Sequence, residues 1–194
     1  MRDRFNAGTT DGSRVYSSGG LRAICLMLAP IPLMLFVIYP YLKRITWLTH
    51  LGLGLAWSMG PLGGWLAVSK SLAGIGDVGW LWLFAVLWVA GFDIIYATMD
   101  IEFDQQEGLF SIPARWGYDP ARHVAALLHI GAFLCLAMLW WTRALSPASL
   151  VWLAAIAGVL MFEHRIAERK PQVAFFQCNA IIGFLVLAFV WFGV

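Results

Sequence analysis

A short acidic segment between two long apolar runs carries the residue types best suited to chemistry in this sequence. Five of the chain's eleven acidic residues fall between positions 93 and 107. On an α-helix with about 100° per residue, Glu102 points one way and a ladder of polar side chains shares the opposite face: Asp93, Tyr96, Asp100, Asp104 and Glu107. Carboxylates one turn apart repel each other unless something lies between them. The spacing therefore indicates a site for a hard cation such as Mg²⁺, and the plain alternative is a solvated helix end.

Two groups of basic residues could accompany such a cation. The string Tyr39-Pro-Tyr-Leu-Lys43-Arg44 closes the first apolar run. A lysine and an arginine there could hold an anionic headgroup or a diphosphate, or could simply anchor the helix at the membrane surface. Arg115 lies in a loop that a glycine and a proline keep from continuing the helix. This loop could fold back over the site.

The composition indicates a membrane protein. Of the 194 residues, 61% are hydrophobic, only 12% are charged and eleven are tryptophan. A soluble domain of this size could not bury so much apolar surface. The net charge of +2 is too small to indicate a nucleic-acid partner. The three cysteines are isolated within apolar runs, so we expect them to pack as small hydrophobic side chains: Cys25, Cys135 and Cys178.

The apolar runs predict an all-α, polytopic transmembrane bundle of about six spans. A spanning helix needs about 20 apolar residues, and each run reaches or approaches that length. The expected spans are 21–42, 47–69, 78–98, 123–141, 147–163 and 173–194. We expect them to form one domain, 21–194. A Gly-, Ser- and Thr-rich tail, 1–20, precedes it, and we expect this tail to be disordered or non-native.

Loop charge predicts the orientation of this bundle. Most of the basic residues follow the first, third and fifth spans: Lys43, Arg44, Arg115, Arg122, Arg165, Arg169 and Lys170. The opposite loops carry only Lys70 and Arg143. By the positive-inside rule the acidic segment faces the cytoplasm. We expect the membrane to be a bacterial inner membrane. The arginines of the tail then fall on the outer side, so either the tail is non-native or preceding helices are missing.

A few polar residues interrupt the apolar spans. Asp93 lies within or at the edge of the third span, where an ionisable group is costly and indicates function. Asn179 in the last span either forms hydrogen bonds between helices or lines a cavity. The segment 163–170 reads as a solvated loop. The four histidines sit near span ends, which favours interface residues over ligands: His50, His123, His129 and His164.

Taken together, these motifs resemble the UbiA superfamily of intramembrane prenyltransferases. Asp93-x-x-Tyr96-Ala-x-x-Asp100-x-x-x-Asp104, followed by Gly108-Leu-x-Ser-Ile-Pro-Ala-Arg115-x-Gly117, is similar to the second aspartate-rich motif of the family. Within the family it is most similar to the 4-hydroxybenzoate polyprenyltransferase branch. Tyr39-x-x-x-Lys43-Arg44-x-Thr46 resembles the motif that closes the fourth helix of the family. Asn179, near the end of the sequence, is also consistent with this family resemblance.

The resemblance covers about residues 21–194 and implies the last six of nine transmembrane helices around a cavity open to lipid. The first motif of the family, Asn-x-x-x-Asp-x-x-x-Asp, has no counterpart, because the only acidic residues upstream of position 77 are Asp3 and Asp11. The chain therefore resembles a truncated homologue in which half of the metal site is absent. We expect such a chain to be less stable than a nine-helix homologue.

The resemblance also implies a mechanism. Asp100 and Asp104 would bind Mg²⁺ that bridges to a polyprenyl diphosphate, with Asp93 as a further ligand or a supporting partner. The allylic C–O bond of that substrate would break, and the resulting cation would alkylate an aromatic acceptor such as 4-hydroxybenzoate. This is a step of quinone biosynthesis. The metal and three basic residues would stabilise the leaving diphosphate: Lys43, Arg44 and Arg115.

Aromatic and amide side chains would complete the implied site. Tyr96 and Tyr41 are candidates for walls that shield the allylic cation. Tyr39 and Asn179 are expected contacts of the substrates. A lipid-open cavity would suit the long prenyl tail.

Three alternatives stay open at this point. The acceptor could be another aromatic compound, for example a menaquinone precursor or one of the futalosine type. The chain could be a non-catalytic membrane subunit or an inactive remnant that retains the fold. A transporter is a further alternative, because carboxylates inside membranes also mark ion pathways. The clustering of the carboxylates at a span exit and the lack of an inverted repeat disfavour a transporter.

Overall fold

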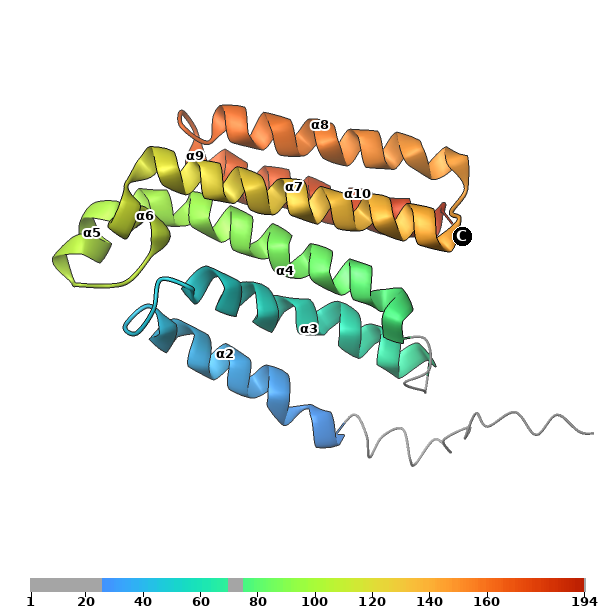
Figure 1. Cartoon of the computed structure of the whole chain (residues 1–194), viewed down its shortest axis with the longest axis horizontal. Helices are drawn as coiled ribbons and strands as arrows, with labels where there is room; N and C mark the ends of the chain where they lie inside the picture. Colours follow the sequence, from blue (N-terminus) through green and yellow to red (C-terminus); the bar gives the residue numbers. More distant parts are fainter. Residues whose placement is uncertain (1–25, 70–74, 194) are drawn as a thin grey trace, which may run out of the picture.

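The structure, a computed structural model, describes residues 26–69 and 75–193. Every element within these residues is helical, which confirms the predicted all-α fold. Figure 1 shows the long helices lying lengthwise beside one another: α2 (Pro30–Leu42), α3 (Thr49–Ser69), α4 (Ile75–Ala97), α7 (Tyr118–Arg143), α8 (Leu150–Ile166) and α10 (Asn179–Trp191). The predicted tail, 1–20, and the beginning of the first expected span lie outside the described residues.

Short elements close the two ends of the bundle. At one end lie η1 (Thr98–Asp100), α5 (Ile101–Gln106) and α6 (Ile112–Trp116), which connect α4 to α7. At the opposite end η2 (Pro147–Ser149) connects α7 to α8 (Figure 1). The chain then passes through α9 (Pro171–Val173) and a π-helical turn, η3 (Ala174–Cys178), into α10.

The described helices form a membrane-spanning bundle. Five helical segments in the described part are long and apolar enough to cross a membrane: Thr49–Ser69, Val78–Gln106, Tyr118–Arg143, Pro147–Ile166 and Pro171–Trp191. They correspond to the second to sixth expected spans. The first expected span corresponds to a shorter apolar helix, Leu26–Leu42. The protein is therefore an integral membrane protein.

The boundaries of two spans differ from the prediction. The helix of the third span continues through η1 and α5 to Gln106 rather than ending near 98, because polar residues can continue a helix beyond the apolar core of a membrane. It ends just before Gly108, whose φ of 63° lies in the left-handed region that glycine adopts without a steric penalty. The fourth span begins at Tyr118, five residues earlier than 123.

Local sequence signals explain α6, the single helical turn after the acidic segment. Ser111 is its N-cap: the backbone is extended, and the side-chain Oγ accepts a hydrogen bond from the Ala114 N–H at 3.2 Å. Pro113 falls in the first turn, where its missing N–H is not needed. Gly117 ends the turn with a φ of 85°. This fixed turn presents Arg115 next to the acidic segment.

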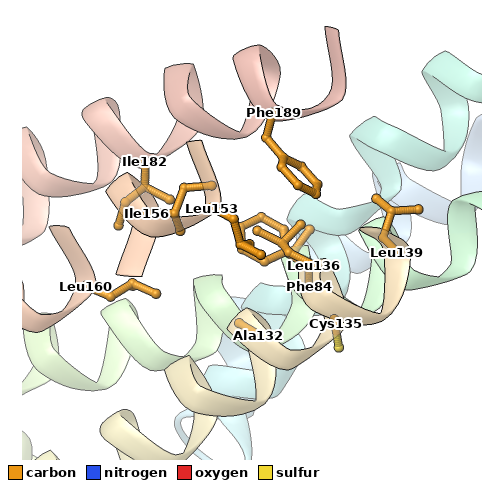
Figure 2. Packing of buried hydrophobic residues seen from close by; sticks show 11 residues of the cluster. Phe84, Ala132, Cys135, Leu136, Leu139, Leu153, Ile156, Leu160, Ile182 and Phe189 are labelled. Atoms are coloured by element: carbon orange, nitrogen blue, oxygen red, sulfur yellow. The ribbon is translucent and has the colours of Figure 1, made fainter. Parts of the chain in front are cut away.

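Tight apolar packing joins α4, α7, α8 and α10. Figure 2 shows the cluster in which Phe84, Leu136, Ile156, Ile182 and Phe189 interdigitate, all of them nearly or fully buried. In lipid the hydrophobic effect no longer drives helices together, so van der Waals contact and shape matching hold these helices in place. The cluster packs the middle of α4, the helix that leads into the acidic segment, against α7, α8 and α10.

Close approach of α3 to α4 depends on one glycine. A Cβ atom added at Gly54 would collide with the backbone carbonyl oxygen of Val86 on α4. Gly54 is itself buried. Small residues at such a crossing allow the helix backbones to pack closely in a membrane. This crossing sets α3 directly against the helix that leads into the acidic segment.

Candidate active site

The two motifs predicted to face each other are joined by an ion pair. Asp104 on α5 is buried, with 1% of its side chain exposed, and both of its carboxylate oxygens lie 3.3 Å from Nζ of Lys43. The backbone reinforces the contact, because the Phe110 N–H donates to the Lys43 carbonyl oxygen at 2.6 Å. The Leu109 N–H donates to the Asp104 carbonyl oxygen at 2.7 Å. The C-terminal end of α2 is therefore held against the acidic segment by side-chain and backbone contacts.

Asp93 has a partner that the sequence did not predict. Oδ2 of Asp93 lies 2.7 Å from Nδ1 of His50, which is 1% exposed near the beginning of α3. Nε2 of the same imidazole accepts the Ile112 backbone N–H at 3.3 Å. His50 is therefore not the interface residue that its place near a span end indicated. The signal that could have found it is an ionisable residue inside an apolar run, the same signal that singled out Asp93.

The acidic ladder does not share one environment. The regular α-helix gives way to a 3-10 turn at Thr98–Asp100, and 3-10 geometry has about three residues per turn instead of 3.6. This change alters the rotation between Asp93 and the later carboxylates. Asp93 forms a hydrogen bond with His50, and Asp104 is buried against Lys43. Asp100, which falls between these two residues in the sequence, is half-buried. Within the described residues the Asp100 side chain has no hydrogen bond or ion pair.

The remaining basic candidates lie at the surface of the same end. Arg115 is exposed in the last turn of α6. Arg44 is exposed and lines a cavity of about 420 Å³ together with Phe103, Glu107, Gly108 and Leu109. Gln105 ties α5 to α6, because its Nε2 donates to the Ala114 carbonyl oxygen at 3.0 Å. Both arginines are therefore free to meet an anion from solution.

The aromatic candidates take different places. The Tyr96 ring lies 4.5 Å from the ring of Phe175, centroid to centroid, and Phe175 also contacts Phe92 at 5.4 Å. Tyr96 therefore belongs to an aromatic cluster between α4 and η3, with part of its surface exposed. Tyr39 is half-buried on α2, whereas Tyr41 is exposed.

Asn179 makes several contacts within the bundle. Its Oδ1 accepts the indole N–H of Trp88 at 2.8 Å. Its Nδ2 donates to the carbonyl oxygen of Phe175 at 2.7 Å, in the π-helical turn. A longer contact of 3.5 Å joins Nδ2 to Oε1 of Glu163. Of the two readings of the sequence, hydrogen bonding between helices is the one that these contacts match.

A polar cluster inside the bundle corrects the first half of the expected solvated loop, 163–170, whereas Glu168, Arg169 and Lys170 after α8 are exposed as expected. α8 continues to Ile166, and Glu163 is fully buried. Its Oε2 lies 3.9 Å from Nδ1 of buried His129, which in turn lies 2.9 Å from Nε2 of His164. His129 also contacts the Trp88 carbonyl oxygen at 3.2 Å. The hydropathy pattern could not show this cluster because it depends on which faces of α7 and α8 meet.

The carboxylates at this end fit a hard cation that also binds a phosphate. In the described residues no three His, Cys, Asp or Glu side chains converge into a closed metal site. Mg²⁺ does not need one, because it takes one or two carboxylates and completes its shell with waters and phosphate oxygens. Asp100, whose carboxylate has no partner within residues 26–69 and 75–193, and Asp104, one turn further along, supply that number of oxygen ligands. The donor set therefore suits Mg²⁺ with an anionic ligand.

These features define the class: an integral membrane helix bundle with paired acidic and basic motifs at one end. The UbiA prenyltransferase family matches residues 15–193 of this sequence, and the chain belongs to that family.

Known relatives support this assignment. The chain is 32% identical over 173 residues to the 4-hydroxybenzoate octaprenyltransferase of Coxiella burnetii (strain CbuK_Q154), a match that covers 86% of this chain and 58% of the relative. It is 31% identical over 172 residues to the 4-hydroxybenzoate solanesyltransferase of Synechocystis sp., covering 84% of this chain and 56% of the relative. The chain thus spans little more than half the length of these curated relatives.

A solved structure gives the same result. The apo structure of a UbiA homolog from Aeropyrum pernix K1 is similar with a TM-score of 0.75 and 30% sequence identity. The match covers 85% of this chain and 62% of that chain. The bundle described above is thus a UbiA-type arrangement of helices.

Proposed function

We propose that this chain takes part in the transfer of a polyprenyl group from a polyprenyl diphosphate to an aromatic acceptor, with 4-hydroxybenzoate as the first candidate. The observation that carries the proposal is the contact between Lys43 and Asp104, because it joins a cation-rich motif to a carboxylate-rich one. A diphosphate with a divalent cation needs both kinds of group at one place. The relatives named 4-hydroxybenzoate octaprenyltransferase and solanesyltransferase support the choice of acceptor.

The proposed metal is Mg²⁺, held by Asp100 and Asp104 with Asp93 as a further ligand or a supporting partner. When bound, Mg²⁺ would act as a Lewis acid that offsets the charge developing on the leaving diphosphate. Lys43, once drawn toward the substrate phosphates, would leave Asp104 to the cation.

Basic side chains would bind and orient the diphosphate. Arg115 and Arg44 are exposed, and a guanidinium matches the geometry of phosphate oxygens with two parallel hydrogen bonds. As the allylic C–O bond breaks, its electron pair leaves with the diphosphate, and these cations would stabilise the charge where it develops. A new C–C bond to the acceptor ring would form, and the ring would lose one proton.

The aromatic cluster would protect the allylic cation. Tyr96 and Phe175 lie with ring centroids 4.5 Å apart, next to Phe92. Electron-rich ring faces attract a cation and exclude water that would otherwise capture it. Tyr39 and Asn179 remain proposed substrate contacts. The site would face the cytoplasm of a bacterial inner membrane, with the prenyl tail in the bilayer.

A membrane-fraction assay tests this proposal. Membranes that contain the full chain are supplied with Mg²⁺, geranyl diphosphate and radiolabelled 4-hydroxybenzoate, beside membranes with the Asp100→Ala variant. We expect prenylated product that requires Mg²⁺ and that falls by about 100-fold in Asp100→Ala. Asp119→Ala, an exposed acidic residue at the beginning of α7, serves as a matched control and retains the product. Product that forms equally in Asp100→Ala, or without Mg²⁺, would contradict the proposal.

A further inference from the structure

His50 joins three separate elements at the candidate site. It is the second residue of α3, and Nδ1 of its imidazole lies 2.7 Å from Oδ2 of Asp93 on α4. On its other side it receives the backbone N–H of Ile112, the first residue of α6, at 3.3 Å. The whole side chain is buried. A buried imidazole with both nitrogens engaged is held in one orientation.

The hydrogen bonds determine which nitrogen carries the proton. The Ile112 N–H can only donate, so Nε2 of His50 must be the acceptor and carry no proton. The proton is then on Nδ1, from which it is donated to Oδ2 of Asp93. Oδ1 of Asp93 has no hydrogen bond within the described residues. His50 therefore occupies one carboxylate oxygen and leaves the other available.

We propose that His50 is a positioning residue that holds the Asp93 carboxylate and the α6 turn, with its Arg115, in one arrangement for the diphosphate. This inference rests on the proposed function and adds a residue outside both sequence motifs. The Ile112 N–H comes directly after Ser111, the N-cap of α6, so that both residues fix where the turn begins. Arg115 follows three residues later. Loss of the His50 contacts would leave Asp93 free to rotate and α6 free to move away.

The contacts of His50 explain why a histidine side chain is suited to this place. The side chain at this place must donate a hydrogen bond to Asp93 on α4 and accept one from the Ile112 N–H on α6. Glutamine also carries one donor and one acceptor, whereas phenylalanine fills similar space with neither. These two substitutions therefore separate the hydrogen bonds of His50 from its volume.

Hydrogen exchange of the Ile112 amide tests the proposal without any turnover. The full chain in detergent micelles is compared with His50→Phe and His50→Gln, and the exchange of the peptide 109–117 is resolved to single residues. We expect Ile112 to exchange about tenfold faster in His50→Phe and close to the original rate in His50→Gln. His123→Phe, an exposed histidine of α7, is the matched control and leaves the rate unchanged. Equal rates in the original chain and His50→Phe, or equal acceleration in both variants, would overturn the proposal.

Core amides of α4 show whether a variant has simply unfolded. Residues 84–92 should keep their slow exchange in every variant that is interpreted, because they lie in the tightly packed part of the bundle. Where His50→Phe fails this condition, Asp93→Leu carries the test instead. It removes the acceptor of the His50 proton, and we expect faster exchange at Ile112 with slow exchange at 84–92. Unchanged exchange at Ile112 in Asp93→Leu would overturn the proposal.

Kinetics then test whether the positioning matters for the diphosphate. We expect His50→Phe to raise the KM for geranyl diphosphate by about tenfold and to leave the KM for the acceptor unchanged. Because part of the effect of His50 acts through the α6 turn and its Arg115, we expect the KM of the double variant His50→Phe/Arg115→Ala to rise by less than the product of the two single effects. Additive effects would overturn this part. If the chain makes no product, the proposed function is contradicted. The hydrogen exchange of Ile112 still tests whether His50 holds the α6 turn.

Discussion

At the scale of single residues, the candidate site is a set of carboxylates with different partners. Asp104 has a lysine, Asp93 has a histidine, and Asp100 has no polar partner among the described residues. The Lys43 ammonium lessens the repulsion between Asp104 and Asp100, which lie one turn apart. The arrangement also leaves Asp100 as the carboxylate that a cation can reach first. If the proposed Mg²⁺ site is correct, removal of the Asp100 carboxylate should affect it most directly.

The ion pair of Asp104 leads to a stability prediction. Lys43→Met leaves a buried carboxylate without its cation, and we expect this to cost about 2 kcal/mol, since Lys43 itself is partly exposed to solvent. The double variant Lys43→Met/Asp104→Leu should recover part of that loss because no buried charge remains. Thermal unfolding in detergent measures both. Arg44→Met, its exposed neighbour, is the control, and a midpoint for Lys43→Met equal to that of Arg44→Met would contradict the prediction.

The residues that could be predicted from the sequence are those whose signal lies along the chain. Asp93, Asp100 and Asp104 stand out by their spacing in an apolar background. His50 is marked only as an ionisable residue in an apolar run, and Glu163 is not marked by spacing at all. The roles of both arise from contacts across 43 positions to Asp93 and 16 positions to Asn179. One-dimensional hydropathy says that a span exists but not which of its faces meets a neighbour. Buried polar contacts between helices therefore emerged only from the structure.

At the scale of the elements, helix crossings and the π-helical turn position the site. The predicted spans were close to the observed helices because about 20 apolar residues make a strong signal. Their ends were less accurate, since polar continuations such as α5 do not differ from a loop in hydropathy. The crossing of α3 and α4 at Gly54 is the element-scale contact that brings His50 to Asp93, one helix turn earlier on α3 and two turns later on α4.

This crossing can be tested with two alanine substitutions. Gly54→Ala places a Cβ against the Val86 carbonyl oxygen, and backbone cannot move aside cheaply, so we expect a loss of about 2 kcal/mol. Gly60→Ala is the matched control on the same helix, because a Cβ there meets no atom within 4 Å. We expect Gly60→Ala to be neutral or slightly stabilising. Thermal midpoints in detergent compare the two, and equal midpoints would exclude a tight crossing at Gly54.

The π-helical turn before α10 gives a second test at this scale. A π-turn leaves backbone carbonyls without regular partners, and the Asn179 amide satisfies that of Phe175 while also accepting from Trp88. Asn179→Leu removes both hydrogen bonds, and we expect a loss of about 2 kcal/mol in the same unfolding experiment. Gln177→Leu, an exposed residue of the same turn, should change little. A larger effect of Gln177→Leu than of Asn179→Leu would contradict the assigned contacts.

At the scale of the whole molecule, the bundle has two unlike ends. The end with α5 and α6 carries most of the basic residues of the described chain, together with the carboxylates of the candidate site (Figure 1). The other end holds the η2 connection, where the Ser146 N–H donates to the carbonyl oxygen of Gly193 at 2.9 Å. Lysine and arginine are retained on the cytoplasmic side of a membrane. The charge asymmetry thus predicts one orientation for the whole chain and with it the side from which the proposed diphosphate substrate would arrive.

Cysteine labelling in a bacterial inner membrane tests this orientation. Glu107→Cys marks the end with the acidic segment, and Ala148→Cys marks the η2 end; both positions are exposed. Cys135 and Cys178 are buried, and replacing Cys25 with serine removes the remaining thiol. We expect a membrane-impermeant maleimide to label Ala148→Cys in intact spheroplasts and Glu107→Cys only in inverted vesicles. The reverse pattern would place the site outside, away from cytoplasmic prenyl diphosphates, and would argue against prenyl transfer as well as against the orientation.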